Sequence, residues 1–248
     1  MSNKNIDFRK FYDDIYKSQA LSDELYIRAT RWKAENLFSL VPNDLSFNKI
    51  LEVGCGAGIL LKEVHRITGC KNLYGVDISE VAIKKATAVL PFGKFQVKPI
   101  SELDYPANFF DLLILCDILE HIPNVEKIIP AITRCSKYIL LKIPIENAIA
   151  LRIMYKIRKL TRNLETHPSG HLYRWNSQEA LRLIRSVDNI KILRFKFEPF
   201  PYELSTHKML IKAIFVKGIQ CLEKLLASQY LSEKTIGGSL FIFCRNMS

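Results

Sequence analysis

The feature that most constrains the fold of this chain is a glycine-rich turn, GCGAG at 54–58, directly after the apolar stretch KILEV. Gly54, Gly56 and Gly58 allow a sharp turn and a close approach of a ligand to the main chain, because no Cβ intervenes. The stretch before the turn has the pattern of a strand, and ILLKEVHRIT after it has the pattern of a helix. A strand, a tight turn and a helix in this order predict a ligand-binding α/β fold.

Strand-like and helix-like segments alternate along the rest of the chain. Strands are predicted at seven apolar stretches: 49–53, 72–79, 94–100, 109–117, 137–145, 189–200 and 237–246. Helices are predicted at 8–42, 59–68 and 79–90, the last capped by Ser79, and 119–135 is helical or turn-rich, broken by Pro123 and Pro130. The alternation predicts the α/β class: a Rossmann-like, seven-stranded, mostly parallel sheet with helices on both faces and helical lid insertions.

The whole chain of 248 residues is expected to form one domain. Its predicted parts are an N-terminal helical cap at 1–45, a cofactor-binding core at 46–146, a lid at 147–185, and C-terminal strands with a basic helix at 186–248. No apolar run reaches the roughly 18–20 residues of a membrane span. The polar N-terminus lacks the apolar region of a signal peptide, so a cytoplasmic location is expected. Six cysteines without a C-x-x-C pair favour reduced thiols.

The net charge of +11 is compatible with a nucleic acid, an anionic membrane surface or an acidic substrate, and does not choose among them. Two segments, 150–163 and 207–226, are basic and apolar together. Such segments can contact a membrane surface peripherally, cover an acidic and apolar acceptor, or form a lid whose cations are merely solvated.

Two carboxylates flank the glycine turn. Glu52 lies two positions before Gly54, and Asp77 ends the second predicted strand. The G-x-G-x-G spacing differs from the G-x-G-x-x-G of dinucleotide sites, and a carboxylate at 52 is poorly placed beside a pyrophosphate. It suits a cationic, phosphate-free ligand such as S-adenosylmethionine (SAM). Asp77 is placed to accept hydrogen bonds from ribose hydroxyls, with Ile78 against the adenine.

The motifs LEVGCGAG, YGVDIS and FDLLILCDILEHI resemble, in order and spacing, those of the class I SAM-dependent methyltransferases over residues 30–185. The resemblance implies S-adenosyl-L-methionine as the cofactor. Pro99 stands where the family often has an acid against the adenine, which leaves that contact to the backbone near Ile100 or to Ser101. The opening FYDDIY is similar to a helix that closes over SAM. The implied cofactor contacts are Glu52, Gly54, Cys55, Gly56, Gly58, Asp77, Ile78, Ile100, Ser101, Tyr12 and Tyr16.

The segment CDILEHI follows the fourth predicted strand, so Cys116 and Asp117 should border the cofactor. If the chain is helical there, Asp117, Glu120 and His121 face the same side. His121 could then act as a general base whose basicity Glu120 raises. Alternatively, the three residues could bind Mg²⁺. In a third interpretation, Glu120 and His121 only shape the loop.

The spacing D-x-x-E-H is similar to the E-x-x-E-H of ubiquinone-biosynthesis O-methyltransferases and small-RNA 2′-O-methyltransferases, in which a later histidine can complete the site. His171 is the first candidate for that histidine and for the catalytic group, and His167 is the second. We therefore expect methyl transfer to an oxygen, hydroxyl or carboxylate, of an anionic or lipid-like small molecule. The alternatives are an RNA methyltransferase, disfavoured because no N-P-P-Y-type motif follows the fourth strand, and a non-enzymatic subunit, disfavoured by the intact turn and Asp77.

Overall fold

The computed structural model describes residues 7–18, 23–148, 170–199, 201, 233 and 237–247. The two basic segments at 150–163 and 207–226, together with His167, lie outside these described residues. Their predicted roles as lid, membrane contact and alternative ligand therefore stay predictions.

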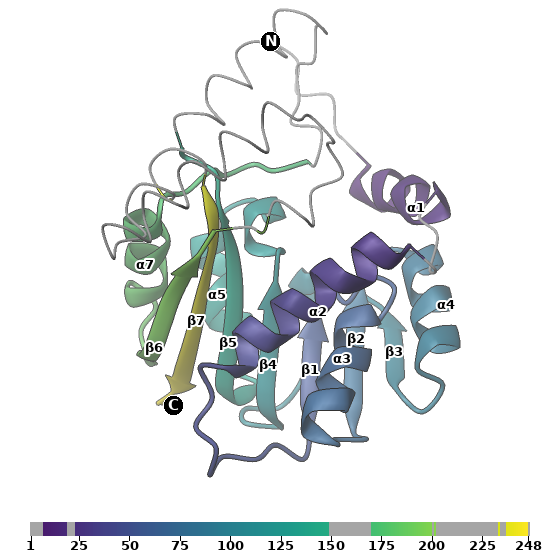
Figure 1. Ribbon diagram of the computed structural model, residues 1–248, viewed down its shortest axis with the longest axis horizontal. Coiled ribbons are helices and arrows are strands. Elements are labelled where there is room, and N and C mark those ends of the chain that lie inside the picture. Colours follow the sequence, from purple (N-terminus) through teal and green to yellow (C-terminus); the bar gives the residue numbers. More distant parts are fainter. Residues whose placement is uncertain are drawn as a thin grey trace, which may run out of the picture.

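Seven strands form one sheet: β1 (Ile50–Val53), β2 (Leu73–Asp77), β3 (Lys94–Val97), β4 (Phe110–Cys116), β5 (Ser136–Ile145), β6 (Ile190–Glu198) and β7 (Gly238–Asn246). Their order is β3-β2-β1-β4-β5-β7-β6 (Figure 1). The pairs among β1 to β5 are parallel. β7 runs antiparallel to both of its neighbours. The predicted seven-stranded, mostly parallel sheet is confirmed.

Helices cover both faces of this sheet. They are α1 (Phe8–Ser18), α2 (Glu24–Phe38), α3 (Ile59–Thr68), α4 (Glu80–Val89), α5 (Val125–Thr133) and α7 (Ser177–Arg185), with short 3₁₀ turns η1 (Ile100–Glu102) and η2 (Leu119–His121). α2 and α3 lie in front of the sheet in Figure 1, and α5 and α7 lie behind it. The prediction of helices on both faces is confirmed.

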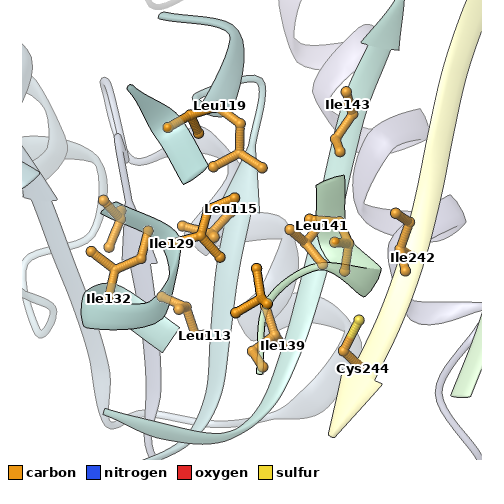
Figure 2. Packing of buried hydrophobic residues seen from close by; sticks show 14 of the residues in the cluster. Leu113, Leu115, Leu119, Ile129, Ile132, Ile139, Leu141, Ile143, Ile242 and Cys244 are labelled. Carbon is orange, nitrogen blue, oxygen red and sulfur yellow. The ribbon is translucent and has the colours of Figure 1, made fainter. Parts of the chain in front are cut away.

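Each central strand is buried on both faces, which explains its nearly continuous apolar sequence. Leu113 and Leu115 of β4 point into the cluster under α5 (Figure 2), whereas Leu112 and Ile114 point into the cluster under α2 and α3. All four are 0% exposed. Burial of each such side chain contributes about 1.5–3 kcal/mol, so the centre of the sheet is a rigid support for the loops at its ends.

One local prediction for residues 119–135 is wrong: Pro130 does not end a helix but lies inside α5. The helix tolerates the missing N–H because Ile129 and Ile132 are buried in the core and Arg134 N donates to Pro130 O again at 3.3 Å. The rest of this segment agrees with the prediction, since Pro123 separates the single turn η2 from α5. Ser79 also caps α4 as predicted, its hydroxyl accepting from Ala82 N at 3.0 Å.

Among the residues described, every helix is too short or too polar to cross a lipid bilayer.

Candidate active site

A cavity of about 300 Å³ opens at the carboxyl ends of β1, β2 and β4. This is the edge where ligands bind in open α/β sheets. The lining residues come from α1, the three strand ends, and the turns that follow β3 and β4. They are Phe8, Tyr12, Tyr16, Val53, Gly54, Val76, Asp77, Ile78, Lys98, Pro99, Ile100, Asp117, Ile118, His121, Ile122 and Pro123.

The glycine turn borders the cavity at Gly54, and two of its positions strongly favour glycine. Gly54 has φ +72°, and a Cβ there would lie 2.7 Å from Ile118 Cδ1. Gly56 has φ +50°, and a Cβ there would lie 2.5 Å from the Tyr16 hydroxyl. The turn therefore needs glycine both for its left-handed backbone and for the close packing of α1 above it.

Asp77 is fixed against this turn by backbone donors. Its Oδ2 accepts from Gly56 N at 2.9 Å, and its Oδ1 accepts from Ser79 N at 2.9 Å. Burial raises the pKa of Asp77, and the N–H donors of Ser79 and Gly56 oppose that rise. A carboxylate has about four acceptor sites, so Asp77 keeps lone pairs for a ligand in the cavity that it lines.

Glu52 provides the test of whether the site suits a cationic ligand. Its side chain is buried, and its Oε2 has no hydrogen-bond partner. Burial and the nearby Asp77 raise its pKa, while Lys33 lowers it. A buried carboxylate without a partner is costly. The ammonium group of SAM would supply the missing partner, so the residues present fit this cofactor.

Some of the remaining predicted cofactor contacts line the cavity and others do not. Ile78, Ile100 and Tyr16 line the cavity. Ser101 is exposed on η1, and the thiol of Cys55 is buried beneath the turn. The backbone near Ile100 therefore matches the predicted adenine contact better than the Ser101 side chain does. Gly58, the N-cap residue of α3, and Cys116, the last residue of β4, are not among the residues that line the cavity, so their contact with the cofactor stays a prediction.

α1 is docked over the cavity by polar contacts that the sequence did not predict. The Asp13 carboxylate accepts from the Ser79 hydroxyl at 2.5 Å and from Val81 N at 3.4 Å, at the amino end of α4. Lys85 of α4 donates to the backbone carbonyl of Tyr16. Figure 1 shows α1 beside α4. These contacts place Tyr12 and Tyr16 on the cavity wall.

A cluster of one carboxylate and two imidazoles lies beside the cavity. His121 Nε2 is 3.9 Å from Glu120 Oε1, and His171 Nε2 is 4.0 Å from the same oxygen. The centroids of the two imidazole rings are 4.7 Å apart. The stretch carrying His171 is held there because Leu172 N donates to Glu120 O at 2.8 Å. The structure thus brings together the three residues proposed from the sequence, with only His121 lining the cavity.

Further groups orient the two imidazoles through contacts to their Nδ1 atoms. The Tyr12 hydroxyl is 2.8 Å from His121 Nδ1, and the carbonyl of Gly170 is 3.3 Å from the same nitrogen. His171 Nδ1 is 2.7 Å from Glu146 Oε2. Sequence reasoning missed Glu146, although a signal was present: like Asp77 and Asp117, it is an acid at the carboxyl end of a strand.

Burial favours the uncharged forms of both Glu120 and His121. Burial and the neighbouring His171 lower the pKa of His121 to about 4, so its imidazole is neutral near pH 7. Burial and Asp117 raise the pKa of Glu120, which is 0% exposed. Both Glu120 oxygens lack a hydrogen-bond partner. This arrangement can accept a proton at His121 or hold a cation between the three side chains.

The donor set does not match the predicted Mg²⁺. Ligand atoms of Glu120, His121 and His171 lie within 4.8 Å of one another, which gives one carboxylate oxygen and two imidazole nitrogens. Mg²⁺ prefers oxygen ligands and near-octahedral geometry, whereas imidazole suits zinc and similar transition-metal ions.

Asp117 does not join this cluster, and its predicted alignment with Glu120 and His121 is wrong. Asp117 has φ +54°, which turns the chain before η2 begins. Its Oδ2 is 2.9 Å from Lys33 Nζ, and its Oδ1 pairs with Lys142. Burial opposes ionisation of Asp117, but Lys142 and Lys33 outweigh it and hold its pKa well below the usual range.

The fold, the glycine turn and the two carboxylates define a SAM-binding α/β protein. A family model described as a methyltransferase domain matches residues 26–186. The chain belongs to this family, within the class I SAM-dependent methyltransferases.

Among curated proteins, the chain is similar to the ubiquinone biosynthesis O-methyltransferase of Thiobacillus denitrificans. The two are 34% identical over 98 residues, 38% of this chain and 41% of that protein. Other ubiquinone biosynthesis O-methyltransferases match over similar lengths. The chain thus spans about two fifths of the length of the curated relatives it matches.

Solved structures confirm the fold. Magnesium protoporphyrin IX methyltransferase from Synechocystis, with bound S-adenosylhomocysteine (SAH), matches with a TM-score of 0.62 at 15% identity, over 96% of this chain and 98% of that chain. Phosphoethanolamine N-methyltransferase 2 of Haemonchus contortus matches with a TM-score of 0.62 at 16% identity, over 98% of this chain and 61% of that chain. At such identities the likeness concerns the architecture.

Proposed function

We propose that this protein transfers a methyl group from SAM to an oxygen of a small-molecule acceptor. The observation that carries the proposal is the unpartnered, buried carboxylate of Glu52 beside a glycine turn that also fixes Asp77. A buried carboxylate that lacks a partner at Oε2, next to the glycine turn, and a fixed acceptor in the cavity lining together suit a cationic nucleoside. Oxygen is favoured by His121 on the cavity wall and by the curated relatives named as O-methyltransferases.

In the proposed complex, Asp77 accepts hydrogen bonds from the ribose hydroxyls. Ile78 and the backbone at Ile100 contact the adenine, and Glu52 pairs with the ammonium group. Tyr16 closes the cavity from above the glycine turn. His121 lines the same cavity and would face the acceptor once SAM is bound.

The transfer forms a bond between the acceptor oxygen and the methyl carbon and breaks the bond between that carbon and sulfur. The electron pair stays on sulfur, which becomes the thioether of SAH, and the hydroxyl proton passes to His121. His121 is neutral at pH 7 because burial lowers its pKa to about 4, so it can accept this proton but is a weak base. Alignment of acceptor and methyl group therefore contributes most of the rate. Tyr12, Glu120 and His171 are positioning residues behind His121.

The acceptor is proposed to be anionic or lipid-like, in line with the net charge of +11 and the quinone-related names of the relatives. An RNA acceptor is not favoured, because the named relatives act in small-molecule biosynthesis. Peripheral membrane contact and a cytoplasmic location remain predictions.

A specific observation also supports a metal-dependent form of the same reaction. Both buried Glu120 oxygens lack partners, and both histidines present Nε2 towards it. The opposite nitrogens are held by Tyr12 and Glu146, as is usual for metal-binding histidines. A bound transition-metal ion would lower the pKa of an acceptor hydroxyl.

The experiment is methyl transfer from labelled SAM to a panel of phenols, catechols and carboxylic acids, with SAH release as a second readout. It is run as purified, after EDTA treatment, and after addition of Zn²⁺, Mn²⁺ or Mg²⁺. Transfer to a hydroxyl supports the proposal, and a requirement for Zn²⁺ or Mn²⁺ assigns the metal form. Labelling of nitrogen or carbon acceptors alone would overturn transfer to oxygen.

A further inference from the structure

The edge of the sheet opposite the cavity carries a basic surface that has no role in the proposed reaction. Because β1 to β5 are parallel and β7 is antiparallel to β5 and β6, this edge holds the amino ends of β1 to β6 and the carboxyl end of β7. Figure 1 shows these ends along the lower edge of the sheet. We call their surface the basic edge. It is formed by residues 39–49, 69–72, 90–94, 106–111, 134–137, 186–191 and 245–247.

The basic edge holds an excess of positive charge. Its segments contain seven lysines and arginines and three acids, Asp44, Asp111 and Asp188. Six of the seven cations are exposed, and Lys49 is half-buried. Within the described part of the chain, only one of the seven, Lys137, forms an ion pair, with Asp111 at 2.9 Å. The seven cations are Lys49, Lys71, Lys94, Arg134, Lys137, Lys191 and Arg245.

Three cations at the cavity end, on α1 and next to β3, are instead paired with acids. The distances between their nitrogen atoms and the carboxylate oxygens are 3.6, 3.2 and 2.6 Å. The pairs are Arg9–Glu80, Lys17–Asp14 and Lys98–Asp104. The positive charge of the basic edge is therefore less neutralised than that of these parts of the cavity end.

Large apolar side chains are exposed among the cations of the basic edge. Phe92, before β3, is 45% exposed, and Phe109, before β4, is 37% exposed. Met247, after β7, is 58% exposed. Lys49 Nζ lies 3.7 Å from the centre of the Phe109 ring, so cations and apolar side chains are neighbours. Exposed apolar side chains mixed with cations are typical of a surface that binds at a lipid–water interface.

We propose that the basic edge binds the surface of a membrane that contains anionic phospholipids. The lipid phosphates supply the negative charge that the basic edge lacks, and Phe92, Phe109 and Met247 enter the headgroup region. A nucleic acid also matches the charge, but bases bind by stacking on rings. Met247 has no ring, and Lys49 already covers one face of the Phe109 ring.

The cavity opens at the opposite edge of the sheet, so it faces the water in this orientation. A membrane-bound molecule therefore stays open to an acceptor that arrives from solution. The inference adds a partner to the proposed function and does not depend on it.

Co-sedimentation of the full chain with vesicles tests the contribution of charge. Vesicles of phosphatidylcholine and phosphatidylglycerol in equal parts should bind the protein, and vesicles of phosphatidylcholine alone should bind it weakly. The triple variant Lys71→Glu/Lys191→Glu/Arg245→Glu should bind the anionic vesicles about a hundredfold more weakly, because each basic residue near an anionic surface contributes about fivefold.

The matched control is Lys62→Glu/Lys84→Glu/Lys127→Glu. It changes the net charge by the same amount, but at exposed lysines on α3, α4 and α5 rather than on the basic edge. It should keep most of the affinity for anionic vesicles. Equal losses in the two triple variants would assign the binding to net charge alone and overturn the inference.

The apolar contribution is tested without a change of charge. Phe92→Ser should lower the affinity for anionic vesicles about tenfold, because it removes an apolar side chain from the lipid interface. Phe195→Ser is the control, since Phe195 is 49% exposed on β6 but lies outside the segments of the basic edge.

A tryptophan at either end of the molecule reports the orientation. With brominated lipids in the anionic vesicles, the fluorescence of Phe92→Trp should be quenched. That of Leu172→Trp, at a residue 49% exposed beside the cavity, should not change. Both variants keep the charge of the protein, and melting temperatures show whether any variant fails to fold.

The opposite pattern of quenching, or no binding of the unaltered protein to anionic vesicles, would overturn the inference. It would also be overturned if the first triple variant lost affinity for single-stranded RNA and kept its affinity for vesicles. Methyl transfer is not a readout in these experiments, so failure of the proposed function leaves their outcome unchanged.

Discussion

The two ends of the cavity are built in different ways. At the cofactor end, Asp77 is held by backbone N–H groups of Gly56 and Ser79, within one strand–turn–helix unit. At the acceptor end, His121 is held by Tyr12 from α1 and by the carbonyl of Gly170, both distant in sequence. In the proposed function, local backbone geometry therefore specifies the cofactor, whereas long-range contacts between side chains and loops specify the chemistry. A family can keep the first and change the second with few substitutions.

The largest expected effect is a loss of SAH affinity from a substitution at the cofactor end. In Asp77→Ala, SAH affinity should fall by several hundredfold, since two hydrogen bonds to a charged acceptor contribute about 1.5–3 kcal/mol each. Calorimetry measures this, and Asp44→Ala, which removes an exposed acid that does not line the cavity, is the control. If Asp77→Ala bound SAH as the unaltered protein does, local specification of the cofactor end would be wrong.

The second prediction concerns the stability of the acceptor end against pH. Burial lowers the pKa of His121 to about 4, below its ordinary 6.5, so the unfolded chain binds more protons between these values. The free energy of unfolding should therefore fall as the pH drops from 6.5 towards 4, by at most about 3 kcal/mol from this group. Urea titrations of the unaltered protein and of His121→Gln across this range isolate the contribution, because other acids affect both alike.

Equal pH slopes for these two proteins would show that His121 is not held in its neutral form. The same result would remove the electrostatic difference between the two ends of the cavity.

The third prediction concerns a substitution that should impair catalysis and leave cofactor binding unchanged. His121→Gln should lower kcat about a hundredfold, the low end for general base catalysis, because His121 is a weak base. SAH affinity should stay within twofold, since the adenosyl contacts are at the other end. His65→Gln, a histidine on α3 outside the cavity, is the control. A parallel loss of SAH affinity would mean that the two ends are not separable.

The smallest expected effect comes from Tyr12→Phe. It removes the hydroxyl 2.8 Å from His121 Nδ1 but keeps the ring on the cavity wall. One hydrogen bond contributes about 1 kcal/mol, so kcat should fall about fivefold with SAH affinity unchanged. Steady-state kinetics with the best acceptor measures it, and an unchanged kcat would leave His121 positioned by Gly170 alone.

The same contrast explains what could be predicted from the sequence. The sheet, the glycine turn and Asp77 depend on residues close in sequence, so periodicity and spacing were sufficient. His171 was placed beside Glu120 only through a resemblance to other families. Glu146 and the two lysines paired with Asp117 were missed, because α2, β4 and β5 must first assemble before those side chains meet.

The error at Asp117 has the same origin. A helical spacing predicted that Asp117, Glu120 and His121 share one face, but the left-handed backbone at Asp117 redirects its carboxylate to Lys33 and Lys142. That conformation has no reliable signal in the residue type, since only a few per cent of non-glycine residues adopt it, although aspartate is enriched there. The ion pairs, which stabilise it, are long-range.

The central claim is that the cavity binds a cationic nucleoside carrying an amino acid rather than a dinucleotide. Calorimetric titration of the unaltered protein with SAH and, separately, with NAD tests it most directly. The account predicts saturable binding of one SAH per chain and no heat with NAD. Binding of NAD, or no binding of SAH by a folded protein, would contradict it.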